Sequence, residues 1–303
     1  MTELSIIIVN YNSLDFISRC IESIKENSLK ELKNGEYEII VIDNASRDGS
    51  QEFLKNLDGI IFVPNENNLG FSKANNIGVK KSKGRYVLFL NPDTIIHRNT
   101  LSKMVEFMNQ NKDVGAATCK VFISESEIDD ASHRGFPTPW NSLMYFSGMS
   151  KLFPKSRIFN GYNMGWIDLN KTHEIDALAG AFMMVRRVAG EDVGWWDEDY
   201  FFYGEDLDFC YMLKKKRWKV YFVAEVSAFH YKGVSGGIKK TSEGITTADL
   251  ETKILATNSR FQAMKIFYDK HYSSKYPFFV TELVKLAITL KLWRSLRKLK
   301  KSS

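Results

Sequence analysis

The chain of 303 residues has few cysteines and no motif that pairs them. Cys20, Cys119 and Cys210 are widely spaced, odd in number and free of any Cys-x-x-Cys pattern. This arrangement argues against a disulfide framework and against a zinc site of the usual spacing. We therefore expect the protein to occupy a reducing compartment.

Long hydrophobic runs and the common nucleotide-binding loops are also missing. The N-terminal stretch MTELSIIIVNYN carries Glu3, and its apolar run hardly extends beyond Ile6–Val9. Such a run is too short for the apolar core of a signal peptide, so the sequence predicts a cytoplasmic protein. No GxGxxG follows the first apolar segment and no GxxxxGK[ST] occurs. These absences exclude the usual dinucleotide fingerprint and the P-loop.

The net charge of +6 is confined to the C-terminal end of the chain. Residues 291–301 hold six basic and no acidic side chains, and subtracting them (42 − 6) leaves 36 basic residues against 36 acidic ones. A basic tail on a neutral body fits an anionic membrane surface better than a nucleic-acid-binding face. We expect no nucleic acid partner.

The first 121 residues alternate short apolar segments with segments of helical spacing. This order predicts an α/β fold with a parallel, doubly wound sheet. The expected strands are 4–10, 37–43, 60–64, 85–90 and 114–121, and the expected helices are 14–27, 51–57, 72–82 and 100–111.

Beyond residue 121 the pattern is less regular. Residues 122–175 are rich in aromatics, glycine and proline and predict loops that shape an acceptor site. Regular structure is expected again at 176–187, in a strand at 219–224, and in a helix that follows a Thr246-x-x-Asp249 capping box and ends near Tyr272. We expect one folded region over 1–272, which divides at residue 121, and a basic amphipathic helix over 273–303.

Polar residues follow three of the expected strands. They are Asn10 and Tyr11, Asp43 and Asn44, and Asn91 and Asp93. In open parallel sheets, ligands bind outside the carboxyl ends of the strands, so we expect a binding site at this edge. Each residue taken alone is also an ordinary turn former.

Three carboxylates lie within the aromatic segment YFFYGEDLDFC (200–210). An apolar setting raises the pKa of a carboxyl group, which suits a general base among Glu205, Asp206 and Asp208. The same residues after Gly204, together with Asp208, also fit the start of a helix, where negative charge is favourable. From these residues alone, both interpretations stay open.

Asp93 and His230 are the candidate metal ligands. Asp93 follows an apolar strand and offers hard oxygen atoms, and His230 in AFHYKG offers an imidazole nitrogen. A lone histidine in such a setting is more often a core residue with satisfied hydrogen bonds.

Five motifs follow one another over roughly residues 4–270. They are SIIIVNYNS, VIDNASRDGS, NNLGFSKANNIGVKKSKGRYVLFLNPDT, DALAGAFMMVRR and FFYGEDLDFCYMLKKKRWKVYFV…FHYKG. In this order they resemble glycosyltransferase family 2, and the match looks closest to its rhamnosyltransferase-like branch. The resemblance implies a GT-A catalytic domain over 1–272, with a nucleotide-binding half (1–121) and an acceptor and catalytic half (122–272). It also implies a nucleoside-diphosphate sugar donor, a divalent metal (Mg²⁺ or Mn²⁺) and inversion at the anomeric carbon.

The resemblance also implies roles for individual residues. Asp206 matches the family's catalytic base, Asp93 matches the last residue of its DxD motif, and His230 matches a metal ligand seen in some members. Asn91 departs from a full DxD and leaves one carboxylate fewer for the metal. The implied substrate-binding residues are Asn10, Tyr11, Asp43, Asn44, Gly70, Phe71, Asn91, Asp93, Glu205 and Trp196; the tryptophan would stack on a sugar, although a core position is equally compatible.

The function implied is transfer of a sugar, with rhamnose from a thymidine diphosphate donor favoured and a UDP-sugar as the other option, to a bacterial surface glycan or lipid-linked acceptor. The competing hypothesis is an inactive nucleotide-sugar or glycan-binding module. The helix from Phe278, with Leu286 and Trp293 on one face, predicts a peripheral position on the inner face of the cell membrane. Docking of this helix on the catalytic region, or a homodimer contact, is the alternative.

Overall fold

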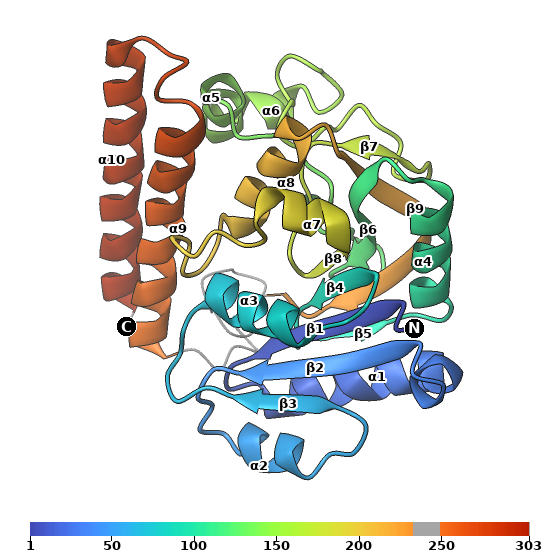
Figure 1. Cartoon of the computed structure of the whole chain (residues 1–303). Helices are drawn as coiled ribbons and strands as arrows, with labels where there is room; N and C mark the ends of the chain where they lie inside the picture. The colour runs from blue at the N-terminus through green and yellow to red at the C-terminus, as the bar shows by residue number, and fades with distance from the viewer. Residues whose placement is uncertain (233–248, 303) are drawn as a thin grey trace.

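The structure is a computed structural model that describes residues 1–232 and 249–302. Figure 1 shows one central sheet with helices on both faces and a pair of long helices beside it. The first half contains β1 (Leu4–Asn10), α1 (Leu14–Lys33), β2 (Tyr37–Asp43), α2 (Ser50–Lys55), β3 (Ile61–Pro64), α3 (Phe71–Lys81), β4 (Tyr86–Leu90), β5 (Thr94–Ile96), α4 (Thr100–Gln110) and β6 (Val114–Phe122).

The second half adds fewer strands and more connecting structure. It contains a 3₁₀ turn η1 (Asp130–Ser132), α5 (Pro139–Ser147), α6 (Met149–Leu152), β7 (His173–Ile175), β8 (Phe182–Arg186), α7 (Arg187–Val193), α8 (Glu205–Lys215), β9 (Lys219–His230), α9 (Leu250–His271) and α10 (Phe278–Ser302). Asp249 caps α9 by accepting a hydrogen bond of 2.7 Å from the backbone N–H of Thr252. Thr246, the other half of the expected capping box, lies outside the described residues.

The sheet is parallel in its first half and mixed beyond. Its order is β3-β2-β1-β4-β8-β6-β9-β5, with β7 paired to β9. The strands β3, β2, β1 and β4 run parallel, as predicted, whereas β8 runs antiparallel to both β4 and β6. The strand β9 extends to His230, beyond the expected end at residue 224.

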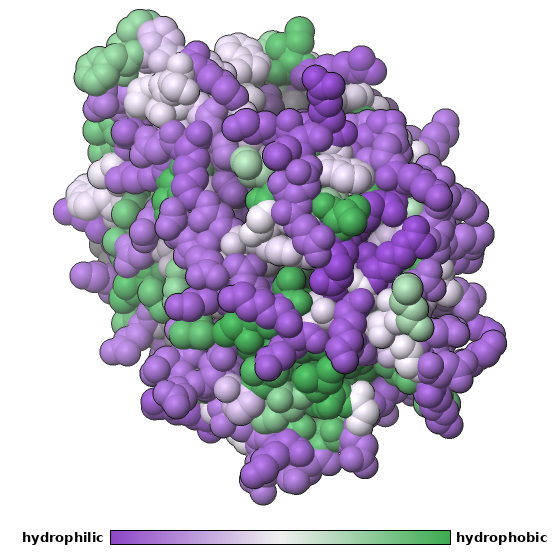
Figure 2. Space-filling view, in the orientation of Figure 1, coloured by the Kyte–Doolittle hydropathy of each residue, from purple (hydrophilic) through white to green (hydrophobic). Residues whose placement is uncertain are grey.

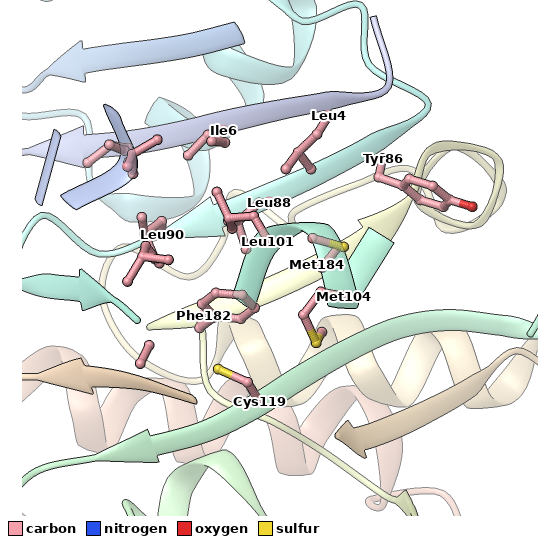
Figure 3. Packing of buried hydrophobic residues seen from close by; sticks show 14 of the residues in the cluster. Leu4, Ile6, Tyr86, Leu88, Leu90, Leu101, Met104, Cys119, Phe182 and Met184 are labelled. Atoms are coloured by element: carbon pink, nitrogen blue, oxygen red, sulfur yellow. The ribbon is translucent and has the colours of Figure 1, made fainter. Parts of the chain in front are cut away.

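Alternate side chains of the buried strands build two cores, one on each face of the sheet. Ile6 and Ile8 of β1 belong to one core, and Ile7 and Val9 belong to the other. Figure 3 shows the first core, where side chains of β1, β4, β8 and β6 meet those of α4. Burial on both faces explains why these strands are apolar throughout instead of alternating.

Two strand pairings bring the polar strand ends together. Asn10 of β1 lies in register with Asp43 of β2, so the two ends share one edge. The short strand β5, directly after the Asn91-Pro92-Asp93 turn, pairs antiparallel with β9 and places Thr94 opposite His230. This ladder carries His230 to the turn that follows β4.

The C-terminal helices α9 and α10 form a hairpin at the side of the molecule (Figure 1). The Tyr268 hydroxyl lies 3.1 Å from the Thr281 hydroxyl, and Val284 packs against the cluster that includes Phe267. The predicted C-terminal helix is therefore docked on the catalytic region. No helix among residues 1–232 and 249–302 is long and apolar enough to cross a membrane.

Candidate active site

A cavity of about 790 Å³ opens at the carboxyl ends of the central strands. Its wall takes residues from the strand ends, from the N-terminus of α8, and from α5, α9 and α10. This size and position are typical of ligand sites in α/β proteins. Of the predicted residues, the wall contains Tyr11, Asn44, Gly70, Phe71, Asn91, Asp93, Glu205, Asp206 and His230.

Asn91, Asp93 and His230 converge at one point of this wall. The Oδ1 atom of Asp93 lies 3.0 Å from Nε2 of His230, and Nδ2 of Asn91 lies 3.3 Å from the same nitrogen. The pairing of β5 with β9 brings these three residues together, because Asp93 immediately precedes β5 and His230 ends β9. The predicted metal ligands are therefore neighbours in space.

A second carboxylate, Asp129, lies on the other side of the His230 ring. Its Oδ2 atom is 3.9 Å from Nδ1 of His230, and its Oδ1 accepts a short hydrogen bond from Lys232. Burial alone would lower the pKa of His230, but Asp93 and Asp129 outweigh it and raise the pKa to about 9. The two carboxylates thus favour the protonated imidazole, and metal binding through this ring requires release of that proton.

The carboxylates of the aromatic segment occupy the first turn of α8. Gly204 precedes this helix with a φ of 84°, and a Cβ there would lie 2.9 Å from Ala263. Glycine is therefore needed both for the backbone conformation and for the close packing. Asp208 points away from the cavity and is hydrogen-bonded to the Tyr200 hydroxyl at 3.2 Å and to Nε2 of His271 at 2.6 Å.

Glu205 and Asp206 share the cavity wall but differ in their partners. Asp206 accepts a hydrogen bond of 2.6 Å from Nη2 of Arg134. Glu205 is buried, its Oε2 atom has no hydrogen-bond partner among the described residues, and burial together with the Asp206 charge raises its pKa to about 8. Glu205 and Asp206 thus begin α8, as the helix-start interpretation predicted, and also line the cavity.

The loop before α3 forms another part of the wall. The φ of Gly70 is 80°, and a Cβ there would lie 2.6 Å from the carbonyl oxygen of Phe201. Asn44 donates a hydrogen bond of 3.2 Å to the Gly70 carbonyl, and the Phe71 N–H donates one of 2.9 Å to the Phe201 carbonyl. These contacts tie the loop to the segment that leads into α8.

Asn10 and Asp43 lie behind the wall instead of in it. Both are fully buried, and Nδ2 of Asn10 donates to Oδ2 of Asp43 at 2.8 Å. Oδ1 of Asp43 accepts from Gln51 and from the Ser46 N–H, each at 2.8 Å. In this conformation the pair braces the loop after β2, and neither side chain is open to a nucleoside.

The prediction that Trp196 stacks on a sugar is wrong. Its side chain is 2% exposed and belongs to the core on the α3 and α8 side of the sheet. It stacks on Phe209 with ring centroids 5.0 Å apart and meets Phe89 edge-on at 4.8 Å. The core position, which the sequence left open for this residue, is therefore the one that the structure shows.

Comparison with known proteins identifies the family. A sequence model described as glycosyl transferase family 2 matches residues 5–184, more than half of the chain. The chain belongs to glycosyl transferase family 2.

Two relatives agree with this assignment. The chain is 27% identical over 235 residues to rhamnosyltransferase WbbL of Escherichia coli strain K12, covering 75% of this chain and 82% of that protein. It is 25% identical over 265 residues to the low-salt glycan biosynthesis hexosyltransferase Agl10 of Haloferax volcanii, covering 86% and 77%.

The structure of mannosyltransferase PcManGT from Pyrobaculum calidifontis, in complex with GDP-Man and Mn²⁺, matches with a TM-score of 0.57 at 15% identity, covering 99% of this chain and 73% of that one. The predicted GT-A fold is confirmed by such neighbours.

Three residues that the sequence did not single out belong to the site of this family 2 glycosyltransferase. Arg134 pairs with Asp206, and Asp129 and Lys232 complete the surroundings of His230. Arg134 and Asp129 lie in the irregular segment after β6, where no periodic pattern marks them. Lys232 was visible only as part of the AFHYKG motif.

Proposed function

We propose that the protein transfers a sugar from a nucleoside diphosphate to an acceptor hydroxyl with inversion at the anomeric carbon. The proposal rests on one observation: two groups of residues line the same cavity. Asp93 and His230 form one group, and Glu205 and Asp206 with Arg134 form the other. Inverting transfer needs these two functions: charge neutralisation at the leaving diphosphate and a base at the acceptor.

Asp206 is assigned as the base. Its carboxylate takes the proton of the acceptor hydroxyl while the acceptor oxygen bonds to the anomeric carbon and the bond from that carbon to the diphosphate oxygen breaks. Arg134 orients this carboxylate through its hydrogen bond to Oδ2. The Nε atom of Arg134 is buried without a hydrogen-bond partner among the described residues.

A divalent metal, Mg²⁺ or Mn²⁺, fits at Asp93 and His230. Oδ1 of Asp93 and Nε2 of His230 lie 3.0 Å apart and offer two metal-coordinating atoms. The described residues contain no group of three or more His, Cys, Asp or Glu side chains placed to hold a metal, so the donor diphosphate would supply further ligands. Magnesium commonly binds in this way, through one or two carboxylates and substrate phosphates. The metal would neutralise charge that develops on the diphosphate.

The donor sugar we favour is rhamnose carried by thymidine diphosphate, with a UDP-sugar as the alternative. Support comes from the motif pattern and from the rhamnosyltransferase relative. The GDP-Man complex of the structural neighbour supports a nucleotide-sugar donor in general. For the acceptor we propose a surface glycan or its lipid-linked precursor at the inner face of the cell membrane.

A donor screen tests the proposal. Purified protein is incubated with dTDP-rhamnose, UDP-sugars or GDP-mannose, each with Mg²⁺ or Mn²⁺, and released nucleoside diphosphate is measured. We expect release with one donor class, and we expect Asp206→Asn to abolish it. Tight nucleotide-sugar binding without release by the native protein would favour the alternative, an inactive binding module.

A further inference from the structure

The cavity continues beyond the catalytic residues into an arm with apolar walls. Leu143 and Phe146 of α5, Met264 of α9, and Leu283 and Ala287 of α10 line this part of the cavity. We call this part the apolar arm. A sugar and a nucleotide are polar, so neither accounts for it.

Two positive charges lie in the wall of the same arm. Arg260 of α9 and Lys291 of α10 both line the cavity, and neither has a carboxylate within 4.0 Å in the described part of the chain. Nζ of Lys291 lies 3.8 Å from the centroid of the Phe146 ring. Partial burial, Arg260 and Arg294 all lower the pKa of Lys291, so like charges lie close together here. Such a cluster is stabilised by a bound anion.

The apolar arm also adjoins an exposed apolar stripe on α10. Phe279, Leu283, Leu286, Leu290 and Trp293 recur at helical spacing and are all exposed. Leu283 belongs both to this stripe and to the wall of the arm. A ligand in the arm therefore has an apolar route to the outer face of α10, where hydrophobic side chains interrupt the hydrophilic surface (Figure 2).

We propose that the apolar arm binds the hydrocarbon chain of a lipid-diphosphate-linked acceptor and that Arg260 and Lys291 bind its phosphate groups. The inference rests on the proposed transferase function, selects the lipid-linked acceptor from the two proposed above, and adds the site that binds it. An apolar chain with an anionic head matches both features of the arm. Because the arm and the catalytic residues share one cavity, the sugar at the end of the diphosphate faces Asp206.

Calorimetric binding of farnesyl diphosphate to the full-length protein tests this site. Farnesol serves as the probe for the hydrocarbon chain alone, and inorganic diphosphate as the probe for the charge alone. The Arg260→Gln/Lys291→Gln variant should bind farnesyl diphosphate at least about tenfold more weakly, because each charge-assisted hydrogen bond contributes about 1.5–3 kcal/mol. The matched control is Arg297→Gln, which removes one charge from α10 outside the cavity wall and should bind like the native chain.

A second variant tests the arm without changing its charges. Ala287→Trp adds bulk at an exposed position and should weaken binding of farnesyl diphosphate but not of inorganic diphosphate. Equal affinity of the native chain and both variants for farnesyl diphosphate overturns the proposal.

Failure of the transferase proposal is a separate result. In that case no donor is turned over, while the dependence of farnesyl diphosphate binding on Arg260 and Lys291 remains. Donor turnover with no such dependence rejects the lipid site alone.

Discussion

Nη2 of Arg134 lies 2.6 Å from Oδ2 of Asp206, although 72 residues separate them in the chain. The two side chains are only 11% and 14% exposed. Removing one partner of a buried pair leaves the other charge uncompensated, so the pair constrains the geometry at this point of the cavity. The carboxylate that we assign as the base is thus held by a residue from an irregular loop.

Asp206→Asn should lower turnover by about 10²–10⁴-fold, because the amide cannot accept the proton of the acceptor hydroxyl. Affinity for the nucleoside diphosphate should stay near that of the native protein. Initial rates and calorimetric binding measure the two effects separately.

The matched control for the base is Glu205→Gln, which alters a neighbouring carboxyl group in the same wall. We expect less than about a tenfold loss of turnover, below the range for removal of a general base. A larger loss for Glu205→Gln than for Asp206→Asn would transfer the role to Glu205.

Asp93→Ala and His230→Ala should each weaken nucleoside diphosphate binding in the presence of Mg²⁺ or Mn²⁺, and much less in its absence. The reason is that both side chains lie where a metal would bridge the protein and the diphosphate. Asp113→Ala, an exposed carboxylate paired with Lys219, is the control and should bind normally. Full turnover in excess chelator would contradict the metal assignment.

Because of Glu205, the free energy of unfolding of the protein should fall as the pH rises. Its folded-state pKa of about 8 lies above the ordinary glutamate value of 4.5, so the folded protein retains a proton that the unfolded chain releases between these values. Stability from this group is therefore present below about pH 4.5 and is lost progressively up to about pH 8. Glu205→Gln removes the titration, so its melting temperature should exceed that of the native protein increasingly from pH 5 to pH 8. Glu22→Gln at an exposed site should show a constant difference, and a constant difference for Glu205→Gln would contradict the prediction.

Much of the fold was predictable because the N-terminal strands are buried on both faces and the helices between them are amphipathic. The antiparallel insertion of β8 was not, since an apolar run such as Phe182–Arg186 carries no sign of strand direction. The pairing of β5 with β9 was equally hidden: three residues after the Asn91-Pro92-Asp93 turn are too few to suggest a strand.

The part of the site that consists of polar residues at strand ends and in recognisable motifs was predictable from the sequence. Asp93, His230 and Asp206 were found from their motifs, and the structure places all three in one cavity. Whether a residue faces the cavity or braces it from behind depends on tertiary packing. Asn10 and Asp43 are hydrogen-bonded to each other, and Trp196 packs in the core. The linear sequence does not distinguish these structural roles from contact with a substrate.

Membrane binding by the C-terminal helix α10 is better tested by substituting its exposed residues than by deleting the helix. Deleting residues 277–303 would expose apolar surface of α9, because Val284 packs against the cluster that contains Phe267 and Tyr268. It would also remove part of the cavity wall. Substitutions on the outer face of α10 avoid both effects.

We expect Leu286→Ser/Leu290→Ser/Trp293→Ser to reduce sedimentation with anionic vesicles at low salt by at least about tenfold, because burying each such side chain in lipid contributes about 1.5–3 kcal/mol. The basic residues of α10 add about 1 kcal/mol each near an anionic surface, so native binding should weaken as salt rises. The control replaces three exposed apolar residues elsewhere, Leu29, Leu152 and Ile158, by serine and should sediment like the native chain. Equal vesicle binding by the α10 variant and the native chain, or no binding by the native chain at low salt, would reject a peripheral membrane role for this helix.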